Sequence, residues 1–232
     1  NPQNPSHKRL WGMIQATFEN RGVVEGHGAG LRARPDINAF AAAGLASDHE
    51  AWTPEEAIDK LRAGIFIEIR PHSMPDTIKG LLAAGLEDWS QIAFTTDDRS
   101  CSDTLKLGAT DYNVRLAIES GLAPEIAIQC VTINPARHMR LTPWVGSIAP
   151  GRFADVVLLD DVERIGIAKV WADGKQVSVG KTYLAAVPEI AWPDWATKTV
   201  NIARKMTKED FAIAAPEGRS TMNAALLRPF HW

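Results

Sequence analysis

Two histidines and one aspartate lie far apart in the chain but have similar surroundings. His27, His49 and Asp97 each close a short run of β-branched or small apolar residues. A divalent metal that activates water needs neutral imidazoles and carboxylates that converge from rigid elements. The three residues therefore predict a metal site. The alternative is that the two histidines are hydrogen-bonded structural residues.

Extended and helical segments alternate around these three residues. A leading helix is expected from Ser6, its N-cap, to about Asn20, because apolar residues recur there at helical spacing. The helix after His49 begins with a capping box, Thr53 to Glu56. The expected strands are 23–27, 45–48, 65–70 and 91–96, and the expected helices between them are 35–43, 53–63 and 74–84.

This alternation predicts an α/β fold with a parallel sheet, either doubly wound or a (β/α)8 barrel. In a barrel the carboxyl ends of all strands open onto one face, so residues that close successive strands meet in one pocket. Four strand units between Val23 and Thr96 are half of what a closed barrel needs. The sequence therefore indicates half of a TIM-like barrel.

The second part of the chain has a different pattern of expected helices, turns and strands. Helices are expected at 111–120 and 124–132, and a turn-rich stretch follows at 146–151. A β run at 154–159 and a hairpin around Asp173-Gly174 then predict a small β domain. Beyond Tyr183 the pattern is weak, and a strap or the start of another domain is expected.

Composition indicates a globular protein that acts on small molecules. The chain has 232 residues, of which 45% are hydrophobic, and these are enough for a packed core. A net charge of −3 gives no electrostatic reason to expect nucleic acid or an anionic membrane as partner. No apolar run reaches the roughly 18 to 20 residues that cross a bilayer.

Cysteine usage favours a reducing compartment. Cys101 and Cys130 form no C-x-x-C pair, so spacing supports neither a disulfide framework nor a cysteine zinc site. The N-terminus has neither a basic region nor an apolar stretch of the signal-peptide type. A cytoplasmic protein is expected.

Several segments together resemble the adenine deaminases of the amidohydrolase superfamily. The resemblance covers roughly Gly22 to Gly174, and its segments come in the family's order and spacing. The main ones are Val24-Glu25-Gly26-His27-Gly28-Ala29-Gly30-Leu31, Ser47-Asp48-His49-Glu50, Thr96-Asp97-Asp98-Arg99, Thr132-Ile133-Asn134-Pro135-Ala136 and Gly146-Ser147-Ile148-Ala149-Pro150-Gly151-Arg152-Phe153-Ala154-Asp155.

The resemblance implies a site with one or two divalent ions of manganese, iron or zinc. It places His27 and His49 at the ends of barrel strands five and six, as ligands of one metal. It places Asp97 at the end of strand eight, as a ligand of the other metal and as the catalytic group that moves protons. The implied reaction is hydrolytic deamination of adenine to hypoxanthine and ammonia.

Other residues near these segments are weaker candidates for substrate binding. Glu50 is expected to contact a purine nitrogen or to orient His49, and Arg70, Ser73 and Asp98 complete this set. His72 stands in Pro71-His72-Ser73, where the family typically has Glu-Gly-Ser. Another amino-heterocycle or a cyclic amide therefore stays open as the substrate.

The chain also lacks two features that the resemblance implies. It has no His-x-His pair and no segment for the fourth-strand glutamate, so a missing N-terminal barrel half is expected as partner. The second alternative is a structural fragment that is inactive until another chain completes the site, and a homo-oligomer is also open. The expected domains are 1–141, the second barrel half; 142–182, return strands of a small β-sandwich; and 183–232, a strap or the beginning of a C-terminal domain.

Overall fold

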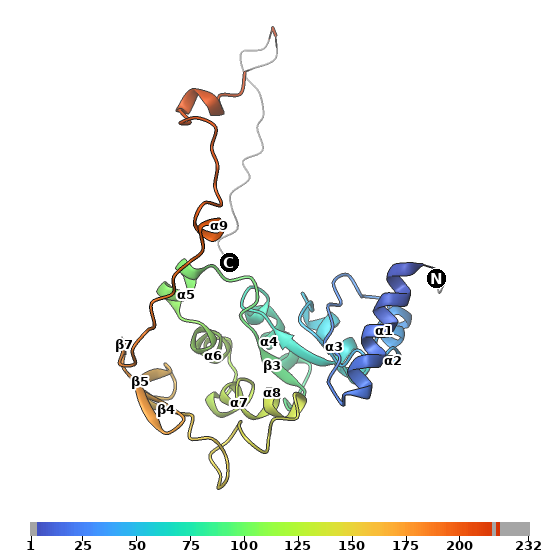
Figure 1. Cartoon of the computed structure of the whole chain (residues 1–232). Coiled ribbons are helices and arrows are strands. Elements are labelled where there is room, and N and C mark those ends of the chain that lie inside the picture. The colour runs from blue at the N-terminus through green and yellow to red at the C-terminus, as the bar shows by residue number, and fades with distance from the viewer. Residues whose placement is uncertain (1–3, 215–216, 219–232) are drawn as a thin grey trace. The chain divides into compact units, whose positions relative to one another are not determined.

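The computed structural model describes residues 4–214 and 217–218, and the chain divides after Leu184 into two compact units (Figure 1). The helices of the first unit are α1 (Pro5–Glu19), α2 (Arg34–Ala42), α3 (Pro54–Arg62), α4 (Met74–Ala83), α5 (Cys101–Leu107), α6 (Thr110–Glu119), α7 (Pro124–Gln129) and α8 (Ile133–His138). Its strands are β1 (Ser47–Asp48), β2 (Phe66–Ile69), β3 (Ile92–Phe94), β4 (Val156–Asp161), β5 (Gly166–Ala172), β6 (Lys175–Val179) and β7 (Thr182–Tyr183). Mixed α/β architecture is confirmed.

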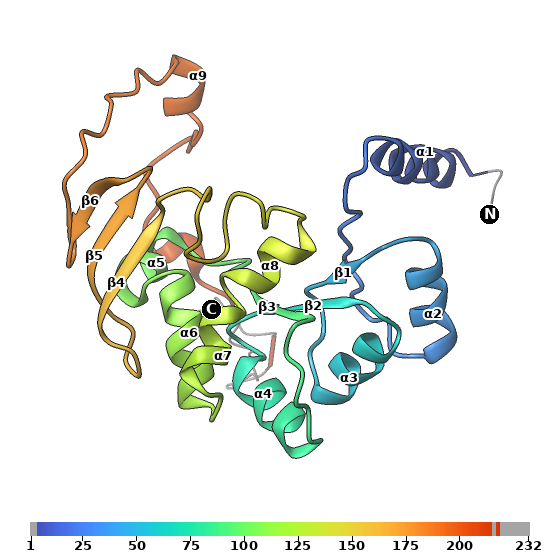
Figure 2. The ribbon, with the colours of Figure 1, turned by 90° about the horizontal axis from the view of Figure 1, so that it is seen from below.

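The first three strands form a parallel sheet in the order β1-β2-β3. Helices α3 and α4 connect them, and both pack on the same side of the sheet (Figure 2). Side chains alternate between the two faces of a strand. In β2, Ile67 and Ile69 join the buried apolar cluster, so Phe66, Glu68 and then Arg70 lie on the opposite face.

The expected strand at 23–27 is not a strand of this sheet, and that prediction is wrong for the described residues. The segment runs beside β1, but the ladder has a single backbone hydrogen bond, from Ala46 N to Val24 O at 2.8 Å. The amide of Gly26 instead donates to the hydroxyl of Ser47, 3.3 Å away, and the amide of Gly28 donates to a carboxylate oxygen of Asp48, 2.7 Å away. In these two hydrogen bonds the acceptor is a side-chain oxygen of β1 and not a backbone carbonyl oxygen.

Helix ends mostly follow the sequence signals. Thr53 accepts a hydrogen bond from Glu56 N at 3.3 Å, as an N-cap should, but the Glu56 carboxylate accepts from Trp52 N, so only half of the capping box forms. The N-cap of α1 is Asn4 and not Ser6, because the Asn4 side chain accepts the first-turn amide at 2.9 Å. Helix α5, capped by Ser100, was not expected from the sequence.

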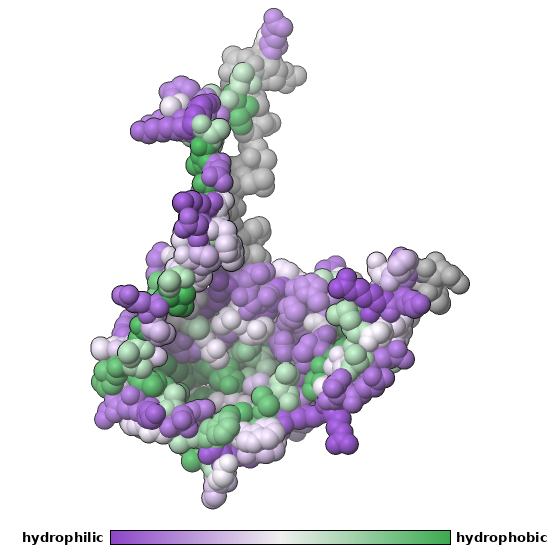
Figure 3. Space-filling model, viewed as in Figure 1, coloured by the Kyte–Doolittle hydropathy of each residue, from purple (hydrophilic) through white to green (hydrophobic). Residues whose placement is uncertain are grey.

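The last four strands of the first unit form one antiparallel sheet in the order β4-β5-β6-β7. The hairpin at Asp173-Gly174 is confirmed: both residues have positive φ, +50° and +72°, as a type I′ turn requires. Among the described residues these four strands form one sheet. Apolar side chains line a hollow between this sheet and α6 to α8 (Figure 3).

The second unit has little regular structure in its described part. It contains the short helix α9 (Asp194–Thr197) and the 3₁₀ turn η1 (Lys208–Phe211). Trp192 and Trp195 are both largely exposed. The expected domain at 183–232 extends beyond the described residues. Among the described residues, no helix is both long and apolar enough to span a bilayer.

Burial makes the two cysteines unequal, which gives a test of the fold. Cys101 is exposed, whereas Cys130 is fully buried, and burial raises the pKa of its thiol to about 12 against the opposing hydrogen bond from Asn134. Because the thiolate is the reactive form, we expect an aromatic disulfide reagent to titrate one thiol in the folded protein and two in denaturant. Cys101→Ser should abolish the folded-state reaction, and Cys130→Ser should leave it unchanged. Rapid reaction of both thiols before unfolding would contradict this packing.

Candidate metal centre

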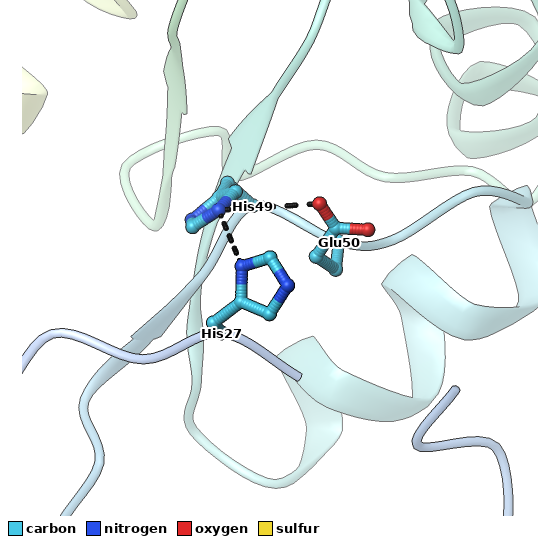
Figure 4. Close-up of side chains that lie close together, drawn as sticks. All are labelled: His27, His49 and Glu50. Carbon is cyan, nitrogen blue, oxygen red and sulfur yellow. Dashed lines mark hydrogen bonds and ion pairs between the residues drawn. The ribbon is translucent and has the colours of Figure 1, made fainter. Parts of the chain in front are cut away.

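Two imidazoles and a carboxylate face one another just beyond the end of β1 (Figure 4). His27 Nδ1 lies 2.9 Å from His49 Nε2, and the rings meet edge to face at 65°. An oxygen of Glu50 lies 4.0 Å from the same His49 nitrogen. These three are the group of metal-ligand type found among the described residues.

The pleat of β1 explains how the two histidines come to share one face. Ser47 pairs with Phe66 and Asp48 with Ile67, so Ser47 and His49 point away from the helices while Asp48 points towards them. On the neighbouring segment, Gly26 faces the helices. A Cβ there would lie 2.4 Å from both the Phe40 ring and the Ser47 carbonyl oxygen, so only glycine fits. His27 then lies on the same face as His49.

A second network stands below the histidines on this face. Glu25 accepts a hydrogen bond from the Ser47 hydroxyl and ion-pairs with His138 Nε2 at 2.8 Å, while the His138 ring stacks on Phe66. Burial raises the pKa of Glu25, but the hydrogen bonds from His138 and Ser47 outweigh it and hold the pKa below its usual range. His138 therefore has a structural role in this network. Nothing in the sequence around it signals this distant partner.

Glu68 lies on the same face as this network. Burial, followed by the negative charge of Glu25, raises the pKa of Glu68 above its usual range. This face of the sheet therefore carries the apolar Phe66 beside two acidic residues. Of these two, Glu68 is more easily protonated than Glu25.

Arg70 connects the candidate ligands at the next strand end. Its guanidinium lies 2.8 Å from Glu50 Oε1 and also donates to Asp97, and it packs over the Trp52 ring at 5.0 Å. Burial raises the pKa of Asp97, but the hydrogen bond and charge of Arg70, with a smaller effect of His49, hold it below its usual range. Asp97 therefore stays ionised at neutral pH. It lies outside the three-residue group and is joined to it through Arg70.

The backbone at Asp97 is strained. Asp97 has φ +47°, a left-handed conformation that a non-glycine residue seldom adopts. Asp97, Asp98, Arg99 and Tyr112 line a small cavity with Arg70 and His72. Asp98 is exposed at this cavity, as a substrate-binding residue would be.

The remaining candidates take different positions. Ser73 is buried, and its hydroxyl donates to the Arg70 carbonyl at 3.4 Å, so it supports the loop from beneath. His72 lies against Trp52 with ring centroids 4.4 Å apart. Burial and the charge of Arg70 lower the pKa of His72.

The donor set fits a divalent metal by its chemistry. Two imidazole nitrogens that share one tetrahedral ion at about 2.0–2.1 Å lie roughly 3.3 Å apart, so the 2.9 Å separation needs a shift of only a few tenths. Histidine and carboxylate donors suit zinc, iron and manganese alike. The residues present can therefore hold such an ion without rebuilding the strand end.

Comparison with known proteins places the chain in a family. Residues 27–185 match the model of the amidohydrolase family, which is more than half of the chain. The chain therefore belongs to the amidohydrolase family.

Several similar proteins carry more specific names. The chain is 71% identical to adenine deaminase 2 of Jannaschia sp. and 69% identical to adenine deaminase 2 of Bradyrhizobium diazoefficiens, over its whole length. It spans 37% of the length of each. Among solved structures it resembles a β-aspartyl dipeptidase from Fervidobacterium islandicum AW-1 with a TM-score of 0.54 and 20% identity. That match covers 70% of this chain and 48% of the other, and it shows the fold alone.

Arg70 should be a strong determinant of stability because it is buried between two carboxylates. Arg70→Met leaves Glu50 and Asp97 close together without their counter-ion, which should cost roughly 3–5 kcal/mol of unfolding free energy. Urea denaturation measures this loss. Arg32→Met is the matched control, because Arg32 pairs with Glu56 while largely exposed, and it should cost less than about 1 kcal/mol. Equal losses in the two variants would show that the Arg70 contacts are not formed.

Proposed function

We propose that this chain contributes to a metal-dependent adenine deaminase, which converts adenine and water to hypoxanthine and ammonia. The single observation that carries the proposal is the pair of facing imidazoles, His27 and His49, at the end of β1 in a chain of this family. The names of the two bacterial relatives support adenine as substrate. Because the chain spans 37% of the length of each relative, we propose that it is one part of the active enzyme.

His27 and His49 would hold one divalent ion of manganese, iron or zinc, and Asp97 would be a ligand of a second. Such an ion lowers the pKa of a bound water from about 15.7 towards 7 and so supplies a nucleophile at neutral pH. Glu50 adds a carboxylate oxygen beside the imidazoles.

Asp97 is the proposed proton carrier. Arg70 keeps it ionised, so it accepts a proton from the attacking water and returns it to the departing amino group. The water oxygen bonds to the ring carbon that carries the amino group, the carbon–nitrogen bond breaks, and ammonia leaves. Arg70 also fixes the direction of the carboxylate.

The proposed substrate contacts lie in two neighbouring places. Asp98 is exposed at the wall of the small cavity beside Asp97, and Glu50 lies outside that cavity and faces the imidazoles. Arg70 would act through Asp97 and Glu50, and Ser73 through the Arg70 backbone. His72 favours a second candidate, another amino-heterocycle or a cyclic amide, because it packs on Trp52 at the loop that differs from the family pattern.

The architecture that goes with this function is the second half of a TIM-like barrel. We assign residues 1–141 to that half, 142–182 to return strands of a small β-sandwich, and 183–232 to a strap or the beginning of a further domain. The resemblance in fold to the β-aspartyl dipeptidase supports this architecture. The missing N-terminal half would be the partner that supplies the remaining metal ligands.

Substitution of the proposed ligands tests the metal site. His27→Ala and His49→Ala should lose bound metal, and Asp97→Asn should lower kcat by roughly 10²- to 10⁴-fold, as expected for the loss of a proton-transfer group. Metal analysis of the chain, and ammonia release from adenine when the chain is co-expressed with the portion of the Jannaschia relative that it does not cover, measure the two effects. His7→Ala on the exposed face of α1 is the control and should change neither. Full metal content in both His27→Ala and His49→Ala would remove the site.

Complementation tests whether another part is needed. The chain should show little adenine turnover alone and gain it when co-expressed with the portion of the Jannaschia relative that it does not cover. Full turnover by the chain alone would contradict the missing-half proposal. Turnover of a cyclic amide in place of adenine would favour the second candidate.

A further inference from the structure

A lysine and an aspartate are buried directly behind the two histidines. Asp48 of β1 and Lys60 of α3 are 0% and 1% exposed, and Lys60 Nζ lies 2.5 Å from Asp48 Oδ2. Asp48 points to the helix side of β1, where its neighbours in the sheet are isoleucines. A carboxylate in such a place needs a cation and hydrogen bonds to be tolerated.

The pair contacts the backbone on both sides of the candidate ligands. Asp48 Oδ1 accepts hydrogen bonds from Gly28 N at 2.7 Å and from Glu50 N at 3.1 Å. Lys60 Nζ donates to Gly28 O at 3.3 Å and to Glu50 O at 3.4 Å. Gly28 follows His27, and Glu50 follows His49. The pair therefore forms hydrogen bonds to both segments that carry the histidines, in each case at the residue that follows the histidine.

Gly28 lets the carboxylate come this close. A Cβ at position 28 would lie 3.0–3.1 Å from all three atoms of the Asp48 carboxyl group, closer than such contacts normally are. The hydrogen bonds also replace the ladder that the segment at 23–27 lacks. Among the hydrogen bonds of the described residues, only the one to Asp48 joins Gly28 to β1. The position of His27 therefore depends on this pair, together with the hydrogen bond from Gly26 to Ser47.

Stability alone is a poor explanation for a buried ion pair. Replacing a buried ion pair with two well-packed apolar residues of similar size often leaves a protein as stable or makes it more stable. The reason is that both charged groups of the ion pair lose their water on burial. What the charged pair adds is direction. Four of its hydrogen bonds hold the Gly28 and Glu50 segments at fixed atoms, and a fifth joins Lys60 to Asp48.

We infer that Asp48 and Lys60 form a positioning unit that sets the spacing of His27 and His49 and so determines the affinity of this site for a divalent metal. The inference rests on the proposed function for the identity of the ligand. Neither residue touches the imidazoles, so both act through the backbone of Gly28 and Glu50.

The test uses the full chain, Co²⁺ as probe and three variants: Lys60→Met, Asp48→Asn and Gly28→Ala. Each should raise the Co²⁺ dissociation constant by about 10- to 100-fold, the range for residues that orient metal ligands. The visible Co²⁺ absorption should also change, because it reports ligand geometry. Histidine-selective NMR without added metal should show shifted His27 and His49 imidazole signals.

Leu81→Ala is the control for a purely structural effect. Leu81 is fully buried on α4 in the apolar core, so its loss lowers the denaturation midpoint by leaving a cavity. Leu81→Ala should lower the denaturation midpoint as much as the three variants do. It should nevertheless leave the Co²⁺ affinity, the Co²⁺ absorption and the imidazole signals unchanged. Gly28→Ala keeps the inference testable if Lys60→Met does not fold, since it alters the contact without exposing a buried charge.

The outcomes separate this inference from the proposed function. Unchanged affinity and imidazole signals in all three variants, or changes equal to those of Leu81→Ala, would overturn the inference and leave the metal site intact. If the parent does not bind Co²⁺, the proposed function falls. The metal-free imidazole signals then decide the positioning role: shifted signals in the variants support it, and unshifted ones reject it.

Discussion

The site depends on how one segment without a backbone ladder is held beside β1. Residues 24–28 keep one backbone hydrogen bond to the neighbouring segment, and side chains supply the rest: Ser47 on one face of β1 and Asp48 on the other. Successive side chains of a strand point to opposite faces, so these two adjacent residues can hold the segment from both sides. The facing imidazoles follow from this arrangement.

The helices determine which of these contacts are strong. α3 packs beside α4 against the isoleucine face of the sheet, and it brings Lys60 under β1, where water is excluded. The attraction between opposite charges is stronger in such a place than at the surface, but both groups lose their water, so each must be fully hydrogen-bonded. Asn134 of α8 plays a comparable part at β3. Its buried amide donates to Trp89 O and Ile92 O, at 2.8 and 3.0 Å, and ties the helix to the strand end.

Local patterns in the sequence predicted most elements but not the contacts that position the site. Thr53, Gly64 and the Asp173-Gly174 turn carry local chemistry, so the ends of α3 and the β5–β6 hairpin were predictable. The segment at 23–27 has the composition of a strand, yet its pairing depends on Ser47 and Asp48, whose roles appear only when β1 lies beside it. Lys60 and His138 were missed for the same reason. Each looks like an ordinary helix residue until its partner, 12 or 113 residues away, is known.

Charge balance at the strand ends favours a cation beside the histidines. Three carboxylates close to the imidazoles, the buried Asp48 and Glu50 and the exposed Asp97, meet two buried cations, Lys60 and Arg70. Lys60 is committed to Asp48, and Arg70 is shared between the other two. One negative charge therefore remains next to two imidazoles, and an opposite charge a few ångströms away stabilises it. A divalent ion held by His27 and His49 would balance this remaining negative charge. Lys60, buried behind the two histidines, would keep their separation constant, and Arg70 would hold the Glu50 and Asp97 carboxylates close to the ion.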